Sequence, residues 1–217
     1  MTRTGERGIV RGCCAGLVLL LILLGGGAFV ADRALAAPAL GAAPAGPSHG
    51  GSEVAIALAL GTDMAGQLLT GAHGVVLLSE RDLTVLAVAN NPHPNTYRNL
   101  QVRVRDGRVV ASAQVSVGPF SPTVVVDITL ALRPGSSGPT IAAQVPEIDI
   151  GLIGLPGFLA TGLVTDIDSA LSLQKLFSVD PRLEALRTDI ECVAIVPGGV
   201  AVGIHNPLSP AVASSCE

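Results

Sequence analysis

The stretch LQVRVRDGRVV, residues 100–110, decides how the central part of this chain folds. Leu100, Val102 and Val104 alternate with polar residues, which is typical of a β-strand with one buried and one exposed face. Asp106 and Gly107 then supply the pair of residues that a two-residue type I′ turn requires. The return strand runs from residue 108 to residue 117, so this stretch predicts an antiparallel β-hairpin.

The alternation continues beyond the hairpin and predicts an antiparallel meander. Turn-forming glycine and proline residues separate two further strands, at residues 123–133 and 140–150. Pro146 indicates an edge or a bulge in the second of these strands, because proline cannot donate a hydrogen bond to the sheet. One face of residues 123–133 is apolar and consists of Val124, Val126, Ile128, Leu130 and Leu132.

Before the meander, a short strand at residues 75–78 leads into a predicted helix. Ser79 and Asp82 have the spacing of a capping box, and the helix should run to about residue 89. Its inward stripe would be Leu83, Leu86 and Ala87. Residues 53–70 predict another helix, interrupted at Gly61.

After the meander, the period changes from that of a strand to that of a helix. Residues 155–175 predict a long amphipathic helix with Pro156 near its first turn, because its apolar positions recur every four residues. These positions are Leu159, Leu163, Ile167 and Leu171. A short helical turn after Pro181 and a final hairpin, residues 188–196 and 200–204, complete an α+β domain.

The N-terminal part of the sequence predicts a membrane segment. Residues 12–31 carry no charge, and a helix of that length crosses about 30 Å. The arginine-rich leader places the N-terminus in the cytoplasm and the remainder outside. Either the segment is an uncleaved single-pass anchor in the cell membrane, or it is a signal peptide cleaved after Ala36, which would make the protein secreted.

The chain therefore divides into four predicted parts. Residues 1–36 are the leader and membrane segment, and residues 37–52 are a flexible tether rich in Pro, Gly and Ala. His49, inside the tether, is read as a solvated linker residue. Residues 53–207 form the extracytoplasmic domain, and residues 208–217 are a tail.

Composition excludes several classes of function. The chain has four Phe, one Tyr and no Trp, and its formal net charge is −4, so it offers neither stacking platforms nor a basic surface for nucleic acid.

The candidate residues for metal binding and catalysis are few, and the four histidines lack metal-ligand spacing. Asp166 is expected on a solvated helix face. Glu147 and Asp149 share a strand face, either as a carboxylate pair or, more simply, as exposed sheet residues. We therefore expect no enzyme, no metal and no cofactor.

Cysteine usage is compatible with export. Cys192 and Cys216 both lie in the part expected outside the cytoplasm, where an oxidising compartment favours disulfides. They are either a disulfide that ties the tail to a strand or two unpaired thiols.

The order of several motifs resembles a known family. VADR (30–33), LSERDL (78–83), VRDGRV (104–109) and IGLIGLP (150–156) are similar, in this order, to segments of the LmeA-like phospholipid-binding family of actinobacterial envelopes. They also resemble half of a tubular lipid-binding (TULIP-like) fold. The resemblance covers residues 75–205. It implies a curved antiparallel β-sheet that wraps around a long amphipathic helix and leaves an aliphatic groove.

These observations predict a membrane-anchored lipid-binding or lipid-handling domain of the cell envelope. Its partners would be the membrane and a phospholipid or other acyl lipid, but no nucleic acid. The alternatives are a non-enzymatic scaffold that binds an envelope protein through its sheet and, less favoured, an extracytoplasmic hydrolase. Groove candidates, each otherwise an ordinary core residue, are Val126, Ile128, Leu130, Leu159, Leu163, Ile167 and Leu171. Head-group candidates, otherwise a polar face, are Arg98, Arg103, Arg105 and Arg108.

Overall fold

The computed structural model describes residues 48–70, 74–116, 121–135, 138–150, 153–156 and 181–205, together with positions 27, 29–31, 33, 40, 162, 165–166, 177–179 and 216. The helices and strands follow in chain order as α2 (Glu53–Leu69), β1 (Gly74–Ser79), α3 (Glu80–Ala89), β2 (Tyr97–Arg105), β3 (Arg108–Val115), β4 (Thr123–Gly135), β5 (Gly138–Ile150), β6 (Ile153–Pro156), α6 (Pro181–Leu186), the 3-10 helix η2 (Arg187–Asp189), β7 (Ile190–Val196) and β8 (Gly199–Ile204).

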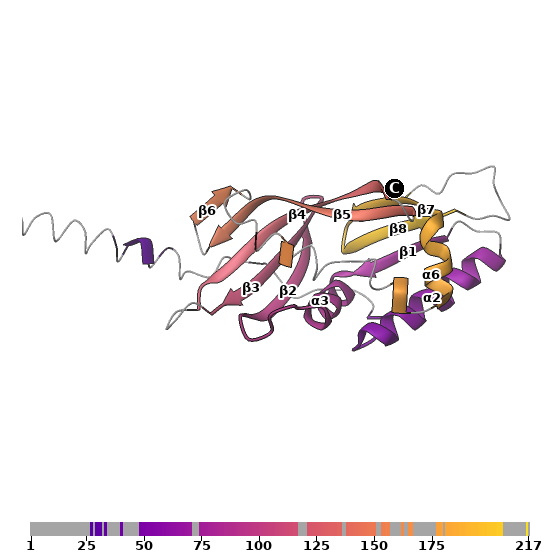
Figure 1. The fold of residues 1–217 in the computed structure, drawn as a ribbon, viewed down its shortest axis with the longest axis horizontal. Helices are drawn as coiled ribbons and strands as arrows, with labels where there is room; N and C mark the ends of the chain where they lie inside the picture. The colour runs from indigo at the N-terminus through magenta and orange to yellow at the C-terminus, as the bar shows by residue number, and fades with distance from the viewer. Residues whose placement is uncertain are drawn as a thin grey trace, which may run out of the picture.

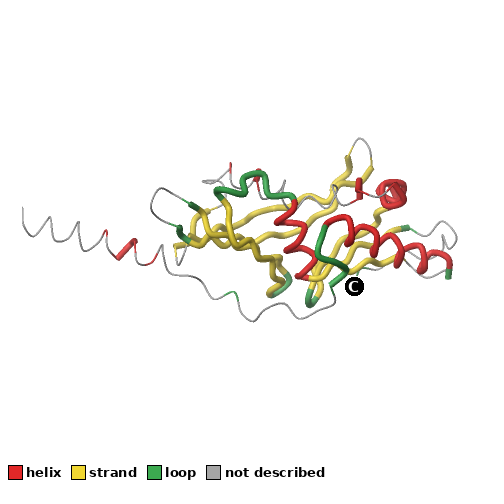
Figure 2. The backbone as a smooth tube through the Cα atoms, turned by 90° about the horizontal axis from the view of Figure 1, so that it is seen from below, coloured by secondary structure: helices red, strands yellow, loops and turns green. Residues whose placement is uncertain are grey.

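The strands form two antiparallel sheets, one with the order β2-β3-β4-β5-β6 and one with the order β1-β8-β7. Figure 1 shows β2, β3 and β6 toward one end of the molecule and the three-stranded sheet toward the other, with the long strands β4 and β5 reaching across to β7. Figure 2 shows the helices gathered toward the end that carries the three-stranded sheet. The predicted mixture of helices with antiparallel sheets is confirmed. The strands do not form a single continuous sheet, because β1 pairs with β8 and not with a strand of the meander.

The five-stranded sheet follows the predicted meander closely. Asp106 and Gly107 have φ angles of 49° and 72°, the left-handed geometry that a type I′ turn needs. The pairing register of β4 and β5 shifts between Asp127 and Thr129, opposite Pro146, which confirms the predicted bulge. The bulge exchanges the two faces of β5, so Ile141 before it and Ile148 after it both point into the core.

Helix α3 begins and ends where the sequence predicts, and it covers the edge of the sheet. Its capping box joins Ser79 and Asp82 in both directions. Thr84 Oγ1 accepts a hydrogen bond from the backbone N–H of Val102 at 3.0 Å, and Glu80 Oε1 accepts one from Val104 at 2.8 Å. These side chains satisfy backbone donors on β2, an edge strand that would otherwise be open to pairing.

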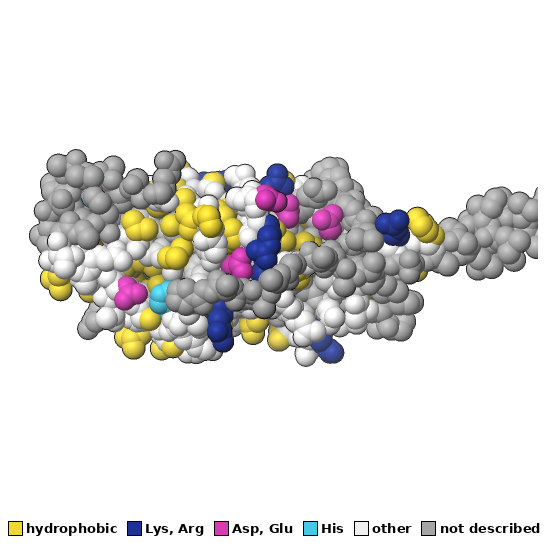
Figure 3. Space-filling model, turned by 180° about the vertical axis from the view of Figure 1, so that it is seen from behind, with side chains coloured by type: hydrophobic (Ala, Val, Ile, Leu, Met, Phe, Trp, Pro, Cys, Tyr) yellow, Lys and Arg dark blue, Asp and Glu magenta, His cyan; other side chains and the backbone are white. Residues whose placement is uncertain are grey.

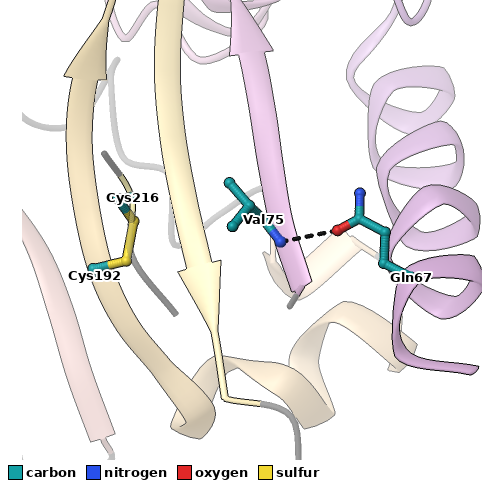
Figure 4. Close-up of a disulfide and its surroundings, with 4 residues drawn as sticks. All are labelled: Gln67, Val75, Cys192 and Cys216. Atoms are coloured by element: carbon teal, nitrogen blue, oxygen red, sulfur yellow. Dashed lines mark hydrogen bonds between the residues drawn. A yellow bond between two sulfur atoms is a disulfide. The ribbon is translucent and has the colours of Figure 1, made fainter. Parts of the chain in front are cut away.

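Helix α2 corrects the expectation of a break at Gly61, because it runs without interruption from Glu53 to Leu69. Its stripe of Ile56, Leu60 and Met64 is buried in the core. Packing of this stripe offsets the cost of about 1 kcal/mol that glycine brings to a helix interior. At the other end, Gln67 Oε1 accepts a hydrogen bond from the backbone N–H of Val75 at 2.9 Å and so covers the edge of β1 (Figure 4).

The predicted start of the long helix at Leu155 is wrong. Leu155 and Pro156 belong to β6, where they pair with Ile148 and Glu147 of β5. Proline is tolerated here because β6 is the last strand of its sheet and Pro156 is the last residue of β6. The groove candidates Leu159, Leu163, Ile167 and Leu171 lie outside the described residues. Within the same stretch, the described positions 162, 165 and 166 are helical.

The predicted membrane segment is described only at positions 27 and 29–31. Among the described residues, no helix is long and apolar enough to cross a membrane.

Candidate functional site

A small apolar cavity lies on the inner face of the five-stranded sheet. Its volume is about 50 Å³, enough for several water-sized groups but not for a whole acyl chain. Side chains of β2, β3 and β4 form the floor, and the loop after α3 and Asp166 form the rim. The apolar residues that line it are Pro92, Leu100, Ala111, Ala113, Val115, Val124 and Val126.

Local features of the strands explain where the cavity forms. The register of β2 and β3 shifts between Arg98 and Gln101, and Asn99 adopts a positive φ of 52° within this bulge. The bulge lies beside the cavity, where Leu100 forms part of the lining, and the small side chain of Ala111 leaves space opposite. Of the groove candidates on β4, Val126 lines the cavity, Ile128 is fully buried in the core and Leu130 packs against the core.

A polar contact stands at the rim of this cavity. The Tyr97 hydroxyl donates a hydrogen bond to Asp166 Oδ2 at 2.8 Å, and His93 Nε2 lies 3.7 Å from Asp166 Oδ1. The His93 and Tyr97 rings are 6.1 Å apart between centroids. Asp166 therefore does not simply belong to a solvated helix face, as the sequence predicted. This contact joins residues 69 positions apart, so no local pattern could have indicated it.

The rim contact alters the acidity of Tyr97. Burial, the hydrogen bond to the Asp166 carboxylate and the negative charge of that group together raise the pKa of Tyr97 to about 12, and burial has the largest effect. The neutral phenol is thus the form that the site favours, and it serves as a donor at the cavity rim.

Titration of Tyr97 should show this effect directly, because it is the only tyrosine of the chain. We expect tyrosinate absorbance to appear near pH 12 in the folded protein and near pH 10 after unfolding. Since the unfolded state releases its proton first, stability should fall as the pH rises from about 10 to about 12. In Asp166→Asn the titration should move to lower pH. An unchanged midpoint in that variant would contradict the contact.

The four head-group arginines do not converge. Arg105 pairs with Glu80 at 3.0 Å and Arg108 with Asp127 at 2.9 Å. Arg98 is exposed and has no acidic partner within the described part of the chain. Figure 3 shows basic side chains scattered over the rear face, several of them next to acidic ones, and not a continuous basic patch.

Arg103 differs from the other three because it is buried, with 6% of its surface exposed. It donates to the backbone oxygen of Val102 at 2.9 Å and to Gln101 Oε1 at 3.0 Å, which are both neutral acceptors. Its Nε has no partner among the described residues. A separate cleft of about 450 Å³ shares Leu100, Ser112 and Ala113 with the apolar cavity, and its other lining residues are Leu40, Asn99, Gln101, Gln114 and Thr123.

A second polar cluster lies at the start of α3 and overturns the reading of His49 as a solvated residue. His49 Nδ1 lies 2.7 Å from Asp82 Oδ2, and the His49 backbone N–H donates to Asp82 Oδ1 at 3.0 Å. Asp82 is fully buried and also accepts hydrogen bonds from the Ser79 hydroxyl and backbone. The sequence separates His49 from Asp82 by 33 residues, which is why the pattern missed this contact.

This cluster is not a nucleophilic triad. The Ser79 hydroxyl donates to Asp82 at 2.6 Å and not to the imidazole, and Ser79 is 2% exposed. Burial raises the pKa of Asp82, but the hydrogen bonds from Ser79 and His49 together outweigh burial, so the pKa lies below the usual value. The cluster holds a stable carboxylate and joins segments of the fold. Among the described residues, no group of three or more His, Cys, Asp and Glu side chains can hold a metal ion.

The structure also locates the two remaining pairs of candidate residues, the cysteines and the carboxylates on β5. Cys192 of β7 and Cys216 form a disulfide with a Cα–Cα distance of 6.0 Å, which ties the C-terminal region to the three-stranded sheet (Figure 4). Glu147 and Asp149 lie on β5 opposite Asp127 and Val125 of β4. Asp149 is half-buried.

In comparisons with known proteins, no protein-family model, curated protein or solved structure matches the chain.

Proposed function

We propose that this protein is a membrane-anchored, extracytoplasmic domain that binds an acyl lipid of the cell envelope. In this proposal the five-stranded sheet curves around the helical segment that follows β6, as in the LmeA-like and TULIP-like proteins that the motif order resembles. The observation that carries the proposal is the apolar cavity between the inner face of β2, β3 and β4 and the rim at Tyr97 and Asp166.

The chemistry of the cavity supports a hydrocarbon ligand. Aliphatic interiors are packed as densely as organic crystals, and voids larger than a water molecule are few. A cavity of about 50 Å³ lined by valine, leucine and alanine side chains is therefore a place where apolar contacts are left unmade. Each buried methylene contributes about 0.8 kcal/mol, so an acyl chain gains from entering such a space.

An acyl chain needs more room than the cavity offers. We therefore assign the observed cavity to the closed, ligand-free form. In this proposal, entry of the lipid separates the Tyr97–Asp166 hydrogen bond at the rim, at a cost of about 1.5–3 kcal/mol for a bond to a charged acceptor. Arg98 is the exposed head-group candidate that has no acidic partner within the described residues. It pairs with Gln114 of β3, so strand alternation turns it to the other face of the sheet from Tyr97 and the cavity.

The other features of the chain agree with a place in the envelope. The uncharged residues 12–31 follow an arginine-rich leader, which is typical of a segment that enters a membrane with its N-terminus inside. The Cys192–Cys216 disulfide is of the kind that persists outside the cytoplasm. Both features support export of the domain to the compartment where envelope lipids are handled.

The proposal can be tested by filling the cavity. The full chain is purified from membranes in mild detergent, and bound lipid is identified and counted by mass spectrometry. We expect about one acyl lipid per chain in the wild type, as in a site that encloses most of its ligand. Ala111→Val places two methyl groups in the space that the acyl chain would occupy. It should reduce bound lipid about tenfold, because the lipid and the new methyl groups together overpack the site at a cost of about 1–3 kcal/mol.

The matched control is Ala131→Val, which adds the same methyl groups to β4 on the face of the sheet away from the core. It should retain the lipid. Thermal unfolding separates a blocked site from a damaged fold, since filling a cavity typically adds about 0.5–2 kcal/mol of stability. Equal lipid content in both variants, or a lipid-free wild type, would reject the proposal and favour a scaffold that binds other proteins.

A further inference from the structure

The segment between the predicted membrane segment and α2 is bonded to the folded domain at two points. Arg105 Nη2 donates to the backbone oxygen of Leu40 at 3.1 Å. Nine residues later, His49 binds the carboxylate of Asp82 through its ring and its backbone N–H, at 2.7 and 3.0 Å. Both points lie near the start of α3, because Arg105 also pairs with Glu80, the first residue of that helix.

The His49 contact has the properties of a built docking site. Asp82 is fully buried, and Ser79 already fixes its carboxylate through the capping box, so the acceptor is oriented before His49 binds. The His49 side chain is 19% exposed and lies between α3 and α2, with its Nε2 at 3.8 Å from Asp63 Oδ2 of α2. A hydrogen bond to a buried charged group is stronger than one between neutral groups.

The turn after His49 is closely fitted as well. A Cβ atom at Gly50 would lie 2.5 Å from the Cβ of Ala55 in the first turn of α2, a distance that real side chains do not adopt. Ser52 then caps α2 by accepting a hydrogen bond from the Ala55 N–H. The chain from His49 to Ser52 is therefore part of the folded domain.

From these contacts we infer that the tether acts as a strap which holds the domain close to the bilayer. This inference rests on the proposed membrane anchorage. If the folded domain began only at Glu53, residues 32–52 would allow it to move as far as about 75 Å from the end of the membrane segment. With Leu40 bound to the domain, residues 32–39 remain, and they span at most about 29 Å.

The strap therefore limits how far the domain can move from the bilayer. While it is docked, the lipid cavity stays within one short span of the membrane from which a lipid would enter. Release of the strap lengthens the reach more than twofold without any change in the fold of the two sheets.

The test compares His49→Ala with His49→Asn in the full chain reconstituted in a phosphatidylcholine bilayer. The asparagine amide nitrogen can occupy the place of imidazole Nδ1 and donate to Asp82, whereas alanine cannot. Hydrogen–deuterium exchange should become about tenfold faster at residues 48–50 in His49→Ala, the change that loss of one hydrogen bond produces. It should stay close to the wild-type rate in His49→Asn and in the control His93→Ala.

Neutron reflectometry on a supported bilayer then measures the height of the domain. We expect the wild type, His49→Asn and His49→Ala to lie close to the bilayer, because Arg105 still holds Leu40 in all three. His49→Ala combined with Arg105→Ala breaks both contacts and should extend further from the bilayer. Unchanged exchange in His49→Ala, or an unchanged height in the variant that combines His49→Ala with Arg105→Ala, would overturn the inference. Lipid content does not enter either measurement, so failure of the lipid proposal and failure of the strap give different results.

Discussion

Asp82→Asn is expected to lower the free energy of unfolding by about 3 kcal/mol, because hydrogen bonds to a buried charged group are worth about 1.5–3 kcal/mol each. The Asp82 carboxylate accepts hydrogen bonds from the Ser79 hydroxyl and backbone and from the His49 backbone, and it contacts His49 Nδ1. An amide of the same shape places its NH₂ group against donors, so at least one buried donor loses its acceptor.

Chemical denaturation of the full chain measures this effect, with Asp106→Asn as the control. Asp106 lies in the exposed β2–β3 turn, where asparagine is equally suited to the positive φ of 49°. The control should change stability by less than about 0.5 kcal/mol. Similar stabilities for the two variants would show that the cluster at the start of α3 does not stabilise the fold.

The same residue predicts a pH dependence. Because the pKa of Asp82 is lower in the folded state than in the unfolded state, its contribution is complete above the ordinary carboxyl range. The contribution is lost as the pH falls through the ordinary value and then the folded value. Asp82→Asn should therefore differ from the wild type most at neutral pH, and the two curves should converge in strong acid. A constant difference down to the lowest pH would contradict the assignment.

Loss of the disulfide is expected to have an effect of similar size. Cys192 and Cys216 are 24 residues apart, and closing a loop of this length stabilises a fold by about 3 kcal/mol through the unfolded state. Cys216 is also buried, with 8% of its surface exposed. We expect Cys192→Ser with Cys216→Ser to lower the denaturation midpoint of the full chain accordingly.

Reducing agent provides the internal control for this prediction. It should lower the stability of the wild type to about that of the double variant and leave the double variant unchanged. If reduction has no effect on the wild type, the cysteines are not paired in solution.

Much of the fold could be predicted because its signals are local. Asp106 and Gly107 specify a turn by their own φ angles, and Ser79 and Asp82 cap a helix three residues apart. Pro146 marks the bulge because it lacks a backbone donor. In each case, the residues that carry the information are also the residues that form the structure.

Other features could not be predicted, because they depend on pairing between distant segments. Leu155 and Pro156 suit the start of a helix as well as the end of an edge strand, and only the presence of β5 beside them decides. The division into two sheets follows from the pairing of β1 with β8, which are more than a hundred residues apart. The alternation of apolar and polar residues predicts which face of a strand is buried, but it does not predict which other strand pairs with it.

The candidate sites show the same limit. Alternation on β4 placed Val126 correctly on the inner face, but the cavity beside it depends on the β2 bulge and on Asp166. The arginines near the first hairpin are close in sequence, yet Glu80 and Asp127 neutralise two of them from other elements. His49 lies in a stretch whose composition is typical of a linker, and its buried partner Asp82 lies 33 residues away on α3.

The most direct test of the lipid-binding account is photo-crosslinking with a phospholipid that carries a diazirine within its acyl chain. The full chain is labelled in bilayers, digested and mapped by mass spectrometry. Cavity residues should be labelled on β3 and β4, in peptides that contain Ala111, Val124 and Val126, and Ala111→Val should remove this label. Label confined to residues 12–31, with none on either strand, would contradict the account.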